Sequence, residues 1–409
     1  MPTRSSQRFR RGETTDLTPS SGMPTLKGVS FGRKASFCLD ASGRRCMPRF
    51  LLACLGLVVG LLGGPAHGQS APSGDTTAAT ARSADWLLLP FASYAPDTKL
   101  AGGLVVGYYR PEPAEGRASS VQSTITVTQR RQLIAQVTPE LYLADGRWRV
   151  QGELQASHFP NSFYGIGGGT PAAAEEAYTS RYVVLDGTAQ RRVGPTLRVG
   201  PRVLVRADAV RDPDPGGLID RGRVPGADGG FAVGVGGSAF WDGRDSRYYP
   251  RTGTYAEVVA TLYSAAWGSD YTFAQVKTDL RAYRSLGPGV VAGQVYTESV
   301  AGTAPFQLLP LLGGADRMRG YREGRYRDDV YWTTQAEYRF PLFWRLKGVA
   351  FASVGAVGPR LGGALARDVE AAVGLGGRFR FTDDGVHGRL DLAYSPTGLE
   401  LYISLGEAF

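Results

Sequence analysis

The sequence predicts an all-β protein, a 16-stranded antiparallel transmembrane β-barrel. Three observations lead to this prediction. An export signal stands near the start of the chain. Through the rest, polar and apolar residues alternate with a period of two. The segments that show this alternation are joined alternately by long and short links. Period-two alternation indicates strands with one wet and one apolar face. Long outer loops with short periplasmic turns are typical of outer-membrane barrels.

Positive charge and cysteine are confined to the front of the chain. All 409 residues together carry a net charge of +9, but residues 1–68 hold ten basic and three acidic side chains. That leaves 36 of the 46 basic and 34 of the 37 acidic residues in the body, a net charge of +2. Cys38, Cys46 and Cys54 also precede residue 69. A nearly neutral body argues against nucleic acid as a partner.

Residues 47–68 have the layout of a secretory signal peptide. An apolar run at 50–64 follows a cluster of arginines, and small residues at 66–68 precede a cleavage site before Gln69. The run is shorter than the ~20 apolar residues of a membrane-spanning helix. We interpret residues 1–46 as an over-called start, with a disordered extension as the alternative. Residues 69–85 are expected to form a short periplasmic linker.

Strands account for the rest of the chain. No stretch after residue 68 approaches 18 consecutive apolar residues, which excludes helical membrane spans. Residues 271–283 show the alternation, with Gln275, Lys277, Asp279 and Arg281 on one face and Ala274, Val276, Leu280 and Ala282 on the other. The sixteen predicted strands are 86–94, 99–110, 120–130, 132–143, 147–157, 179–192, 195–208, 230–241, 254–264, 271–284, 288–300, 330–340, 346–356, 369–381, 387–395 and 399–409.

The links between these strands set their orientation. If the chain enters from the periplasm, the longest links follow odd strands, at 158–178, 209–229, 301–329 and 357–368. Links after even strands are mostly short, and the exceptions are 111–119 and 242–253. Trp and Tyr near strand ends suit the aromatic girdles of a membrane barrel. The alternative is a soluble β-sandwich with its apolar faces turned inward, which alternation alone does not exclude.

Enzyme chemistry finds little support. His158 and His387, the histidines of the body, stand far apart without a neighbouring Cys or His, so no metal site or cofactor is predicted. The glycine-rich run at 161–169 is not part of a strand–helix unit, so no nucleotide site is expected there. We could assign no role to this run. We do not expect an enzyme.

Three motifs stand in the second half of the chain. The first is Gly313-Gly314-Ala315-Asp316-Arg317-Met318-Arg319-Gly320-Tyr321, in the sixth external link. The second spans residues 240–253 and contains Asp242-Gly243-Arg244-Asp245, with Pro250 and Gly253 after it. The third is the last strand, which contains Leu405 and Gly406 and ends in Phe409. With these motifs and the glycine-rich run at 161–169, residues 86–409 resemble the BamA/TamA-like outer-membrane barrels, the bacterial surface antigen family.

The resemblance implies that the sixth external loop folds into the lumen and carries a functional tip, Met318, Arg319, Gly320 and Tyr321. Family members place an acidic partner for this arginine on the strand equivalent to 346–356, where this chain has Ser353. Glu337, Glu370 and Asp391 are therefore the alternative partners. A solvated surface loop is the alternative interpretation of the link.

The resemblance gives the other two motifs a role as well. The 240–253 motif is interpreted as a self-satisfied polar turn rather than an acid–base pair. Leu405, Gly406 and Phe409 are expected to be the signal by which the barrel-assembly machinery recognises this protein as a client. An ordinary edge strand is the alternative.

The expected function is outer-membrane biogenesis, in which a barrel in the bacterial outer membrane moves or inserts protein or lipid. Family members precede their barrels with periplasmic POTRA domains, and the residues between Gln69 and Trp86 leave no room for one. We therefore expect contact with outer-membrane lipid and with a separate periplasmic partner. A passive channel or structural barrel is the alternative.

Overall fold

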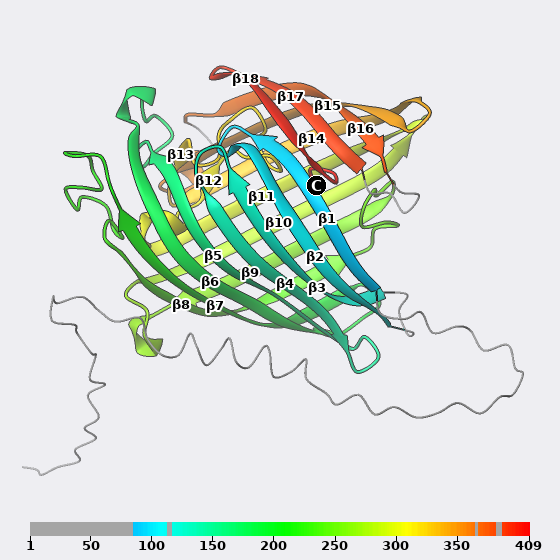
Figure 1. Cartoon of the computed structure of the whole chain (residues 1–409), viewed down its shortest axis with the longest axis horizontal. Coiled ribbons are helices and arrows are strands. Elements are labelled where there is room, and N and C mark those ends of the chain that lie inside the picture. Colours follow the sequence, from blue (N-terminus) through cyan, green and yellow to red (C-terminus); the bar gives the residue numbers. More distant parts are fainter. Residues whose placement is uncertain (1–84, 113–116, 365–366, 382–386) are drawn as a thin grey trace, which may run out of the picture. The chain divides into compact units, whose positions relative to one another are not determined.

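The computed structural model describes residues 85–112, 117–364, 367–381 and 387–409, which form a closed antiparallel β-barrel (Figure 1). Around the barrel the strand order is β1-β18-β17-β16-β15-β14-β11-β10-β9-β8-β7-β6-β5-β4-β3-β2. The predicted extension at 1–46, the signal peptide at 47–68 and nearly all of the linker at 69–85 lie outside the described residues. Among the described residues, no helix is long and apolar enough to cross a membrane.

All sixteen predicted strands are confirmed. Their bounds are β1 Asp85–Ala95, β2 Lys99–Glu112, β3 Arg117–Thr128, β4 Leu133–Leu143, β5 Trp148–Phe163, β6 Glu176–Arg192, β7 Leu197–Arg211, β8 Gly229–Asp242, β9 Gly253–Tyr263, β10 Thr272–Leu286, β11 Gly289–Thr303, β14 Val330–Phe343, β15 Leu346–Gly358, β16 Glu370–Arg380, β17 His387–Ser395 and β18 Gly398–Leu405. Two predictions need correction. The link at 111–119 shrinks to 113–116, and the last strand ends at Leu405 rather than Phe409.

The wall is apolar outside and polar inside, the reverse of a soluble sandwich. On β10, Gln275 and Asp279 are buried, whereas Val276 and Leu280 are 40% and 44% exposed. On β16 the outward Leu375 is 68% exposed. A sandwich would turn such residues inward, so this pattern removes the soluble alternative. It is the pattern of a sheet whose outer face meets lipid.

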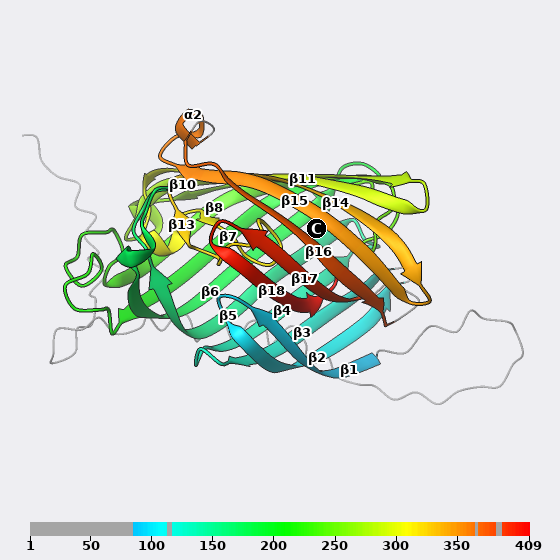
Figure 2. The same ribbon diagram turned by 90° about the horizontal axis from the view of Figure 1, so that it is seen from above.

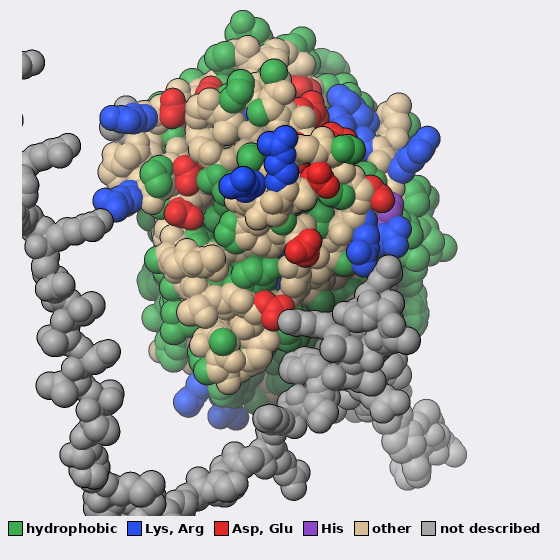
Figure 3. Space-filling model, turned by 90° about the vertical axis from the view of Figure 1, so that its left-hand side faces the viewer, with side chains coloured by type: hydrophobic (Ala, Val, Ile, Leu, Met, Phe, Trp, Pro, Cys, Tyr) green, Lys and Arg blue, Asp and Glu red, His purple; other side chains and the backbone are tan. Residues whose placement is uncertain are grey.

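The two ends of the barrel differ as predicted. The links 164–175, 212–228, 304–329 and 359–369 gather at one end, which we call the long-loop end. The opposite, short-turn end has links such as 193–196 and 344–345, and 243–252 is its long exception. Seen from the long-loop end, charged side chains of both signs are scattered over the loops, and hydrophobic side chains cover the flanks (Figure 3).

One strand pair closes the barrel weakly. Every residue of β1 has a partner on β2, from Asp85 to Ala95. Toward β18, β1 makes a single register pair, Tyr94 with Ile403. Figure 2 shows the two strands meeting at this seam. Because a ladder gains stability residue by residue, the seam is the least stabilised junction of the wall.

Candidate functional site

The sixth link at the long-loop end, residues 304–329, is here called loop six. It contains the 3-10 turn η3 (Phe306–Leu308) and two short strands, β12 (Leu311–Leu312) and β13 (Tyr326–Arg327), which pair with each other. The pairing closes the base of the loop and leaves a tip between the two strands. Met318, Arg319 and Tyr321 of that tip are each 0% exposed. The tip therefore lies against the inner wall rather than in solvent.

Arg319 is held by two carboxylates of the wall. Its Nη1 donates to Asp391 Oδ2 of β17 at 2.6 Å, and its Nη2 donates to Glu337 of β14. All three side chains are 0% exposed. A guanidinium offers donors in a planar fork, so separate nitrogens can each bond an acid on a different strand, whereas an ammonium would have to reach both acids from a single nitrogen.

Gly320 and Tyr321 fix the tip through their backbone. Gly320 has φ +107°, and a Cβ there would meet the Cβ of Ala372 at 3.0 Å. Its N–H donates to the Tyr402 hydroxyl at 2.9 Å, and that hydroxyl donates in turn to the Tyr321 carbonyl at 3.2 Å. Only glycine combines this φ with so close an approach, which explains the Arg-Gly pair.

The floor under Arg319 is made by an aromatic ring and two glycines. The guanidinium lies over the Phe351 ring, 3.7 Å from its centroid. A Cβ on Gly374 would meet Phe351 at 2.2 Å, and a Cβ on Gly376 would meet Asp391 Oδ1 at 2.0 Å. The glycines of β16 thus leave the space that the ring and the carboxylate occupy.

The four candidate partners divide into three groups. Glu337 and Asp391 contact Arg319 directly. Glu370 instead accepts a hydrogen bond from the Tyr321 hydroxyl at 2.6 Å. Ser353 is not brought to Arg319, and its Oγ is buried without a hydrogen-bond partner among the described residues. Register explains the difference, because Asp391 pairs with Gly376 and so faces the space that the missing side chain leaves.

The glycine-rich run without an assigned role docks the other side of loop six. Arg322 donates to Ser162 Oγ and Tyr164 Oη, each at 3.1 Å, and to Asn161 Oδ1 at 3.2 Å. Arg325 donates to the Thr170 carbonyl at 2.7 Å. Each half of this contact can be seen in the sequence, but no pattern indicates that residues 160 positions apart would meet.

Loop six and the link 164–175 also meet through a backbone hydrogen bond and through the Glu175 carboxyl. The Gly167 N–H donates to the Arg327 carbonyl at 2.8 Å. Burial opposes ionisation of Glu175, but hydrogen bonds from Ser162 and Tyr164 and the charge of Arg322 lower the pKa of its carboxyl. Loop six is therefore fastened to the link 164–175 as well as to the wall.

An apolar cluster packs beside this contact at the long-loop end. Phe306 of loop six is 0% exposed and lies against Phe163 and Tyr178 of β5 and β6, with ring centroids 5.2 and 5.3 Å apart. Ile219 and Val224 of the link 212–228 belong to the same cluster. The cluster ties three long segments together above the polar lumen.

The Asp-rich turn at the short-turn end satisfies itself. Asp242 accepts two hydrogen bonds from the Arg244 guanidinium, at 2.8 and 3.1 Å. Asp245 accepts from the backbone N–H groups of Arg251 and Thr252 at 2.9 and 3.2 Å. Neither carboxylate is free to act as a base, so the arrangement is that of a polar turn.

The last residues do not continue the wall. Gly406 has φ +82°, and after it Ala408 and Phe409 are 7% and 4% exposed inside the barrel. Leu405, the last residue of β18, faces outward at 49% exposure. The aromatic side chain of the predicted assembly signal is thus buried in the folded barrel.

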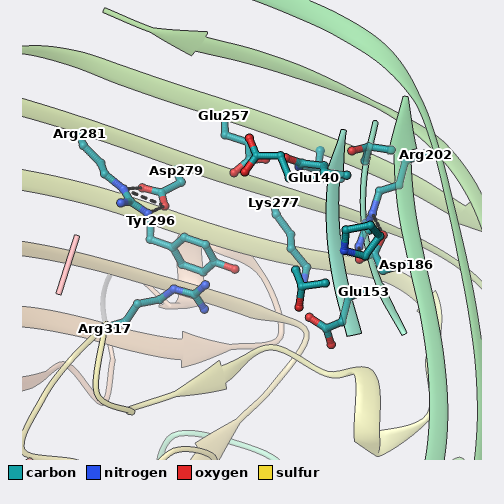
Figure 4. Close-up of a pocket in the computed structure, with 16 residues that line it drawn as sticks. Glu140, Glu153, Asp186, Arg202, Glu257, Lys277, Asp279, Arg281, Tyr296 and Arg317 are labelled. Carbon is teal, nitrogen blue, oxygen red and sulfur yellow. Dashed lines mark hydrogen bonds and ion pairs between the residues drawn. The ribbon is translucent and has the colours of Figure 1, made fainter. Parts of the chain in front are cut away.

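The rest of the lumen holds a polar cavity of about 470 Å³ (Figure 4). Glu140, Glu153 and Asp186 line it from β4–β6, and Glu257 and Lys277 line it from β9 and β10. Arg317 of loop six closes one side and lies over the Tyr296 ring, 3.8 Å from its centroid. Among the residues that the structure describes, no group of three or more His, Cys, Asp or Glu is placed to hold a metal ion.

Comparison with known proteins gives one family and a set of similar barrels. The Omp85 superfamily domain matches residues 114–381. BamA from Haemophilus ducreyi lacking POTRA domains 1-3 is 13% identical with a TM-score of 0.55, over 77% of this chain and 69% of that chain. CdiB from Acinetobacter baumannii is 9% identical with a TM-score of 0.52, over 79% of this chain and 60% of that chain.

CdiB from Escherichia coli is 11% identical with a TM-score of 0.52, over 77% of this chain and 61% of that chain. The chain therefore spans about three fifths of each CdiB chain. No curated protein sequence matches it. At these identities the structural likeness shows a shared barrel fold.

Proposed function

The chain belongs to the Omp85 superfamily, and from that premise we propose that it is an outer-membrane barrel that inserts or translocates protein or lipid by opening its seam. The family confirms the resemblance to BamA/TamA-like barrels. The long-loop end then faces the cell exterior and the short-turn end faces the periplasm. A separate periplasmic partner would deliver the client, and barrel-assembly machinery would first insert this protein as a client itself.

The seam between β1 and β18 carries the proposal. One register pair joins these strands, whereas β1 pairs with β2 along its whole length. An unpaired strand edge offers backbone N–H and C=O groups that a client strand could join. Opening the barrel here breaks fewer hydrogen bonds than opening it between two fully paired strands. Each hydrogen bond contributes ~1 kcal/mol net, so the free energy of opening is lowest at the seam.

A reducible lock across the seam tests the idea. Tyr94→Cys with Ile403→Cys places two thiols on partner residues, and the body of the chain has no other cysteine. Tyr94→Cys with Leu100→Cys is the matched control. It keeps the Tyr94 substitution but links β1 to β2, which are paired along the whole of β1. Outer-membrane protein and lipid content is then compared in cells carrying each pair, with and without a reductant.

We expect the seam lock to reproduce the effect of deleting the gene and the reductant to reverse it, with the control pair behaving as wild type. Normal outer-membrane protein and lipid content in cells with a fully formed seam disulfide would refute the proposal.

A passive channel is the second candidate, and the charged cavity in the lumen favours it. Glu153 of β5 and Lys277 of β10 both face this cavity, which suits hydrated ions and polar solutes (Figure 4). Planar-bilayer recording distinguishes the two. If the protein is a channel, the wild-type barrel or the Arg319→Ala variant should conduct ions. Absence of current from both would count against the channel.

A further inference from the structure

The last four residues cross the lumen instead of extending the wall. The Gly406 N–H donates to the His387 carbonyl at 2.8 Å, the last bond of β18 with β17. Beyond it, Ala408 and Phe409 pack with Tyr283 of β10 and Ala292 of β11. Neither β10 nor β11 is a neighbour of β18 in the barrel. We call residues 406–409 the inner tail.

Glu407 attaches the inner tail to the wall through two arginines. Arg378 of β16 donates from Nε to Glu407 Oε2 at 2.8 Å, and Arg339 Nε of β14 lies 3.8 Å from the same oxygen. Arg339 Nη2 also donates to the Phe409 main-chain oxygen at 3.0 Å. The Glu407 side chain is 4% exposed and both arginine side chains are 0% exposed.

These arginines also hold the two carboxylates that anchor loop six. Arg339 Nε donates to Glu337 Oε2 at 2.9 Å, and Arg378 Nη1 donates to Asp391 Oδ1. The contacts close into a six-membered ring of alternating charge, which we call the ion ring. Its members in order are Arg319, Glu337, Arg339, Glu407, Arg378 and Asp391.

The six members of the ion ring balance one another in charge. The ring has three guanidiniums and three carboxylates, each between two of opposite sign, and a further guanidinium, that of Arg389, lies outside it with Nε 3.7 Å from Asp391 Oδ2. In an interior of low dielectric, an uncompensated charge is costly and each pair polarises the next. Loss of one member therefore alters the partners of the others.

We propose that the inner tail is a latch for loop six, and that Glu407 positions Arg339 and Arg378 so that Glu337 and Asp391 remain available to Arg319. Without Glu407 the ring carries an excess positive charge, and the two wall arginines turn toward the carboxylates that hold the loop. Since β18 is also the seam strand, its position is tied to the docking of loop six. The coupling goes beyond the proposed function and does not depend on it.

Thiol labelling in the folded barrel measures the coupling. Met318→Cys reports on loop six, because Met318 is 0% exposed and the body of the chain lacks cysteine. Glu407→Gln should increase the labelling rate of this cysteine by a membrane-impermeant maleimide about 5- to 150-fold, the usual range of coupling between two sites. Glu400→Gln, the same change on β18 outside the ring, should leave the rate unchanged.

Reciprocity supplies a second, independent measurement, because a coupling free energy acts equally in both directions. With Ala408→Cys as the reporter of the inner tail, Arg319→Gln should raise labelling by a similar factor. Arg317→Gln is the matched control, since Arg317 lies in the same loop and stacks on Tyr296 instead of joining the ring.

Two results would overturn the proposal. In one, Glu407→Gln exposes residue 408 but leaves residue 318 protected, which would mean that the tail is fastened without being coupled to the loop. In the other, Arg319→Gln exposes the loop and not the tail. If Glu407→Gln does not give the folded, heat-modifiable form on gels, the reciprocal arm decides alone. Unchanged labelling of residue 408 in Arg319→Gln would then refute the latch.

Discussion

Gly376→Ala should loosen the Arg319 site although residue 376 touches no part of loop six. The added Cβ would lie 2.0 Å from Asp391 Oδ1 and 2.9 Å from the Leu390 carbonyl oxygen. Ordinary contact begins near 3.4 Å, so the carboxylate must retreat by about 1.4 Å. Asp391 is short and is held by arginines on both oxygens, so it cannot move without disturbing one of these ion pairs.

The cost follows from what that movement breaks. A retreat of this size displaces Oδ1 from Arg378 Nη1, and because both oxygens belong to one carboxylate it also disturbs the 2.6 Å bond from Arg319 to Oδ2. A hydrogen bond to a charged group contributes ~1.5–3 kcal/mol, and overpacking a tight site adds ~1–3 kcal/mol. We therefore expect Gly376→Ala to lower the free energy of unfolding by ~2.5–6 kcal/mol in all.

The neighbouring glycine is a matched control. A Cβ on Gly377 meets nothing within 4 Å, and neither glycine has a positive φ. Gly377→Ala should be neutral or slightly stabilising, because alanine loses less backbone entropy than glycine on folding. The assay is urea unfolding of the barrel in lipid vesicles, followed by tryptophan fluorescence and by the folded band on unheated gels. Equal free energies of unfolding for the two variants would refute the claim that Gly376 leaves the space occupied by the Asp391 carboxylate.

Three further changes test the docking of loop six by the same unfolding assay. Arg319→Lys keeps the charge but loses the planar guanidinium, so we expect the free energy of unfolding to fall by ~2–4 kcal/mol. Arg317→Lys should leave it within ~0.5 kcal/mol of wild type. Tyr402→Phe removes the hydroxyl between Gly320 and Tyr321 and should cost ~1–3 kcal/mol, whereas Tyr394→Phe, at a position 60% exposed, should cost nothing measurable. Arg322→Ala separates loop six from Asn161 and Tyr164, so proteases should cut the link 164–175 faster, and equal cutting in wild type and variant would count against that contact.

Most of the wall could be predicted because it depends on local pattern. Alternation along one strand tells which residues share a face, and the polar face of 271–283 is the lumenal one. The position of loop six came from counting links, and Glu337 and Asp391 stood among the candidates because both lie on polar faces. Pattern could not choose between them and Ser353, since the choice depends on height within the barrel, which the register of neighbouring strands sets.

Contacts across the lumen could not be predicted for the same reason. Nothing in residues 161–169 announces that Arg322 will reach them, because the two segments meet only after the barrel has closed. The inner tail was missed because a glycine near the end of a strand fits a straight edge as well as a turn. Gly406 turns at φ +82°, and the structure alone shows the direction of the turn.

The interior of this barrel stabilises the place where its wall is weakest. β18 has a full ladder with β17 but one register pair with β1, so backbone bonds hold one of its edges only. Two inward contacts compensate, from Tyr402 to the tip of loop six and from Glu407 to the ion ring. Buried ion pairs add little net stability but specify geometry strongly, because each charge has one arrangement in which it is neutralised. Sheet pairing with β17 thus places one edge of the seam strand, and lumenal contacts supply what the other edge lacks, so a change in the lumen bears directly on the seam.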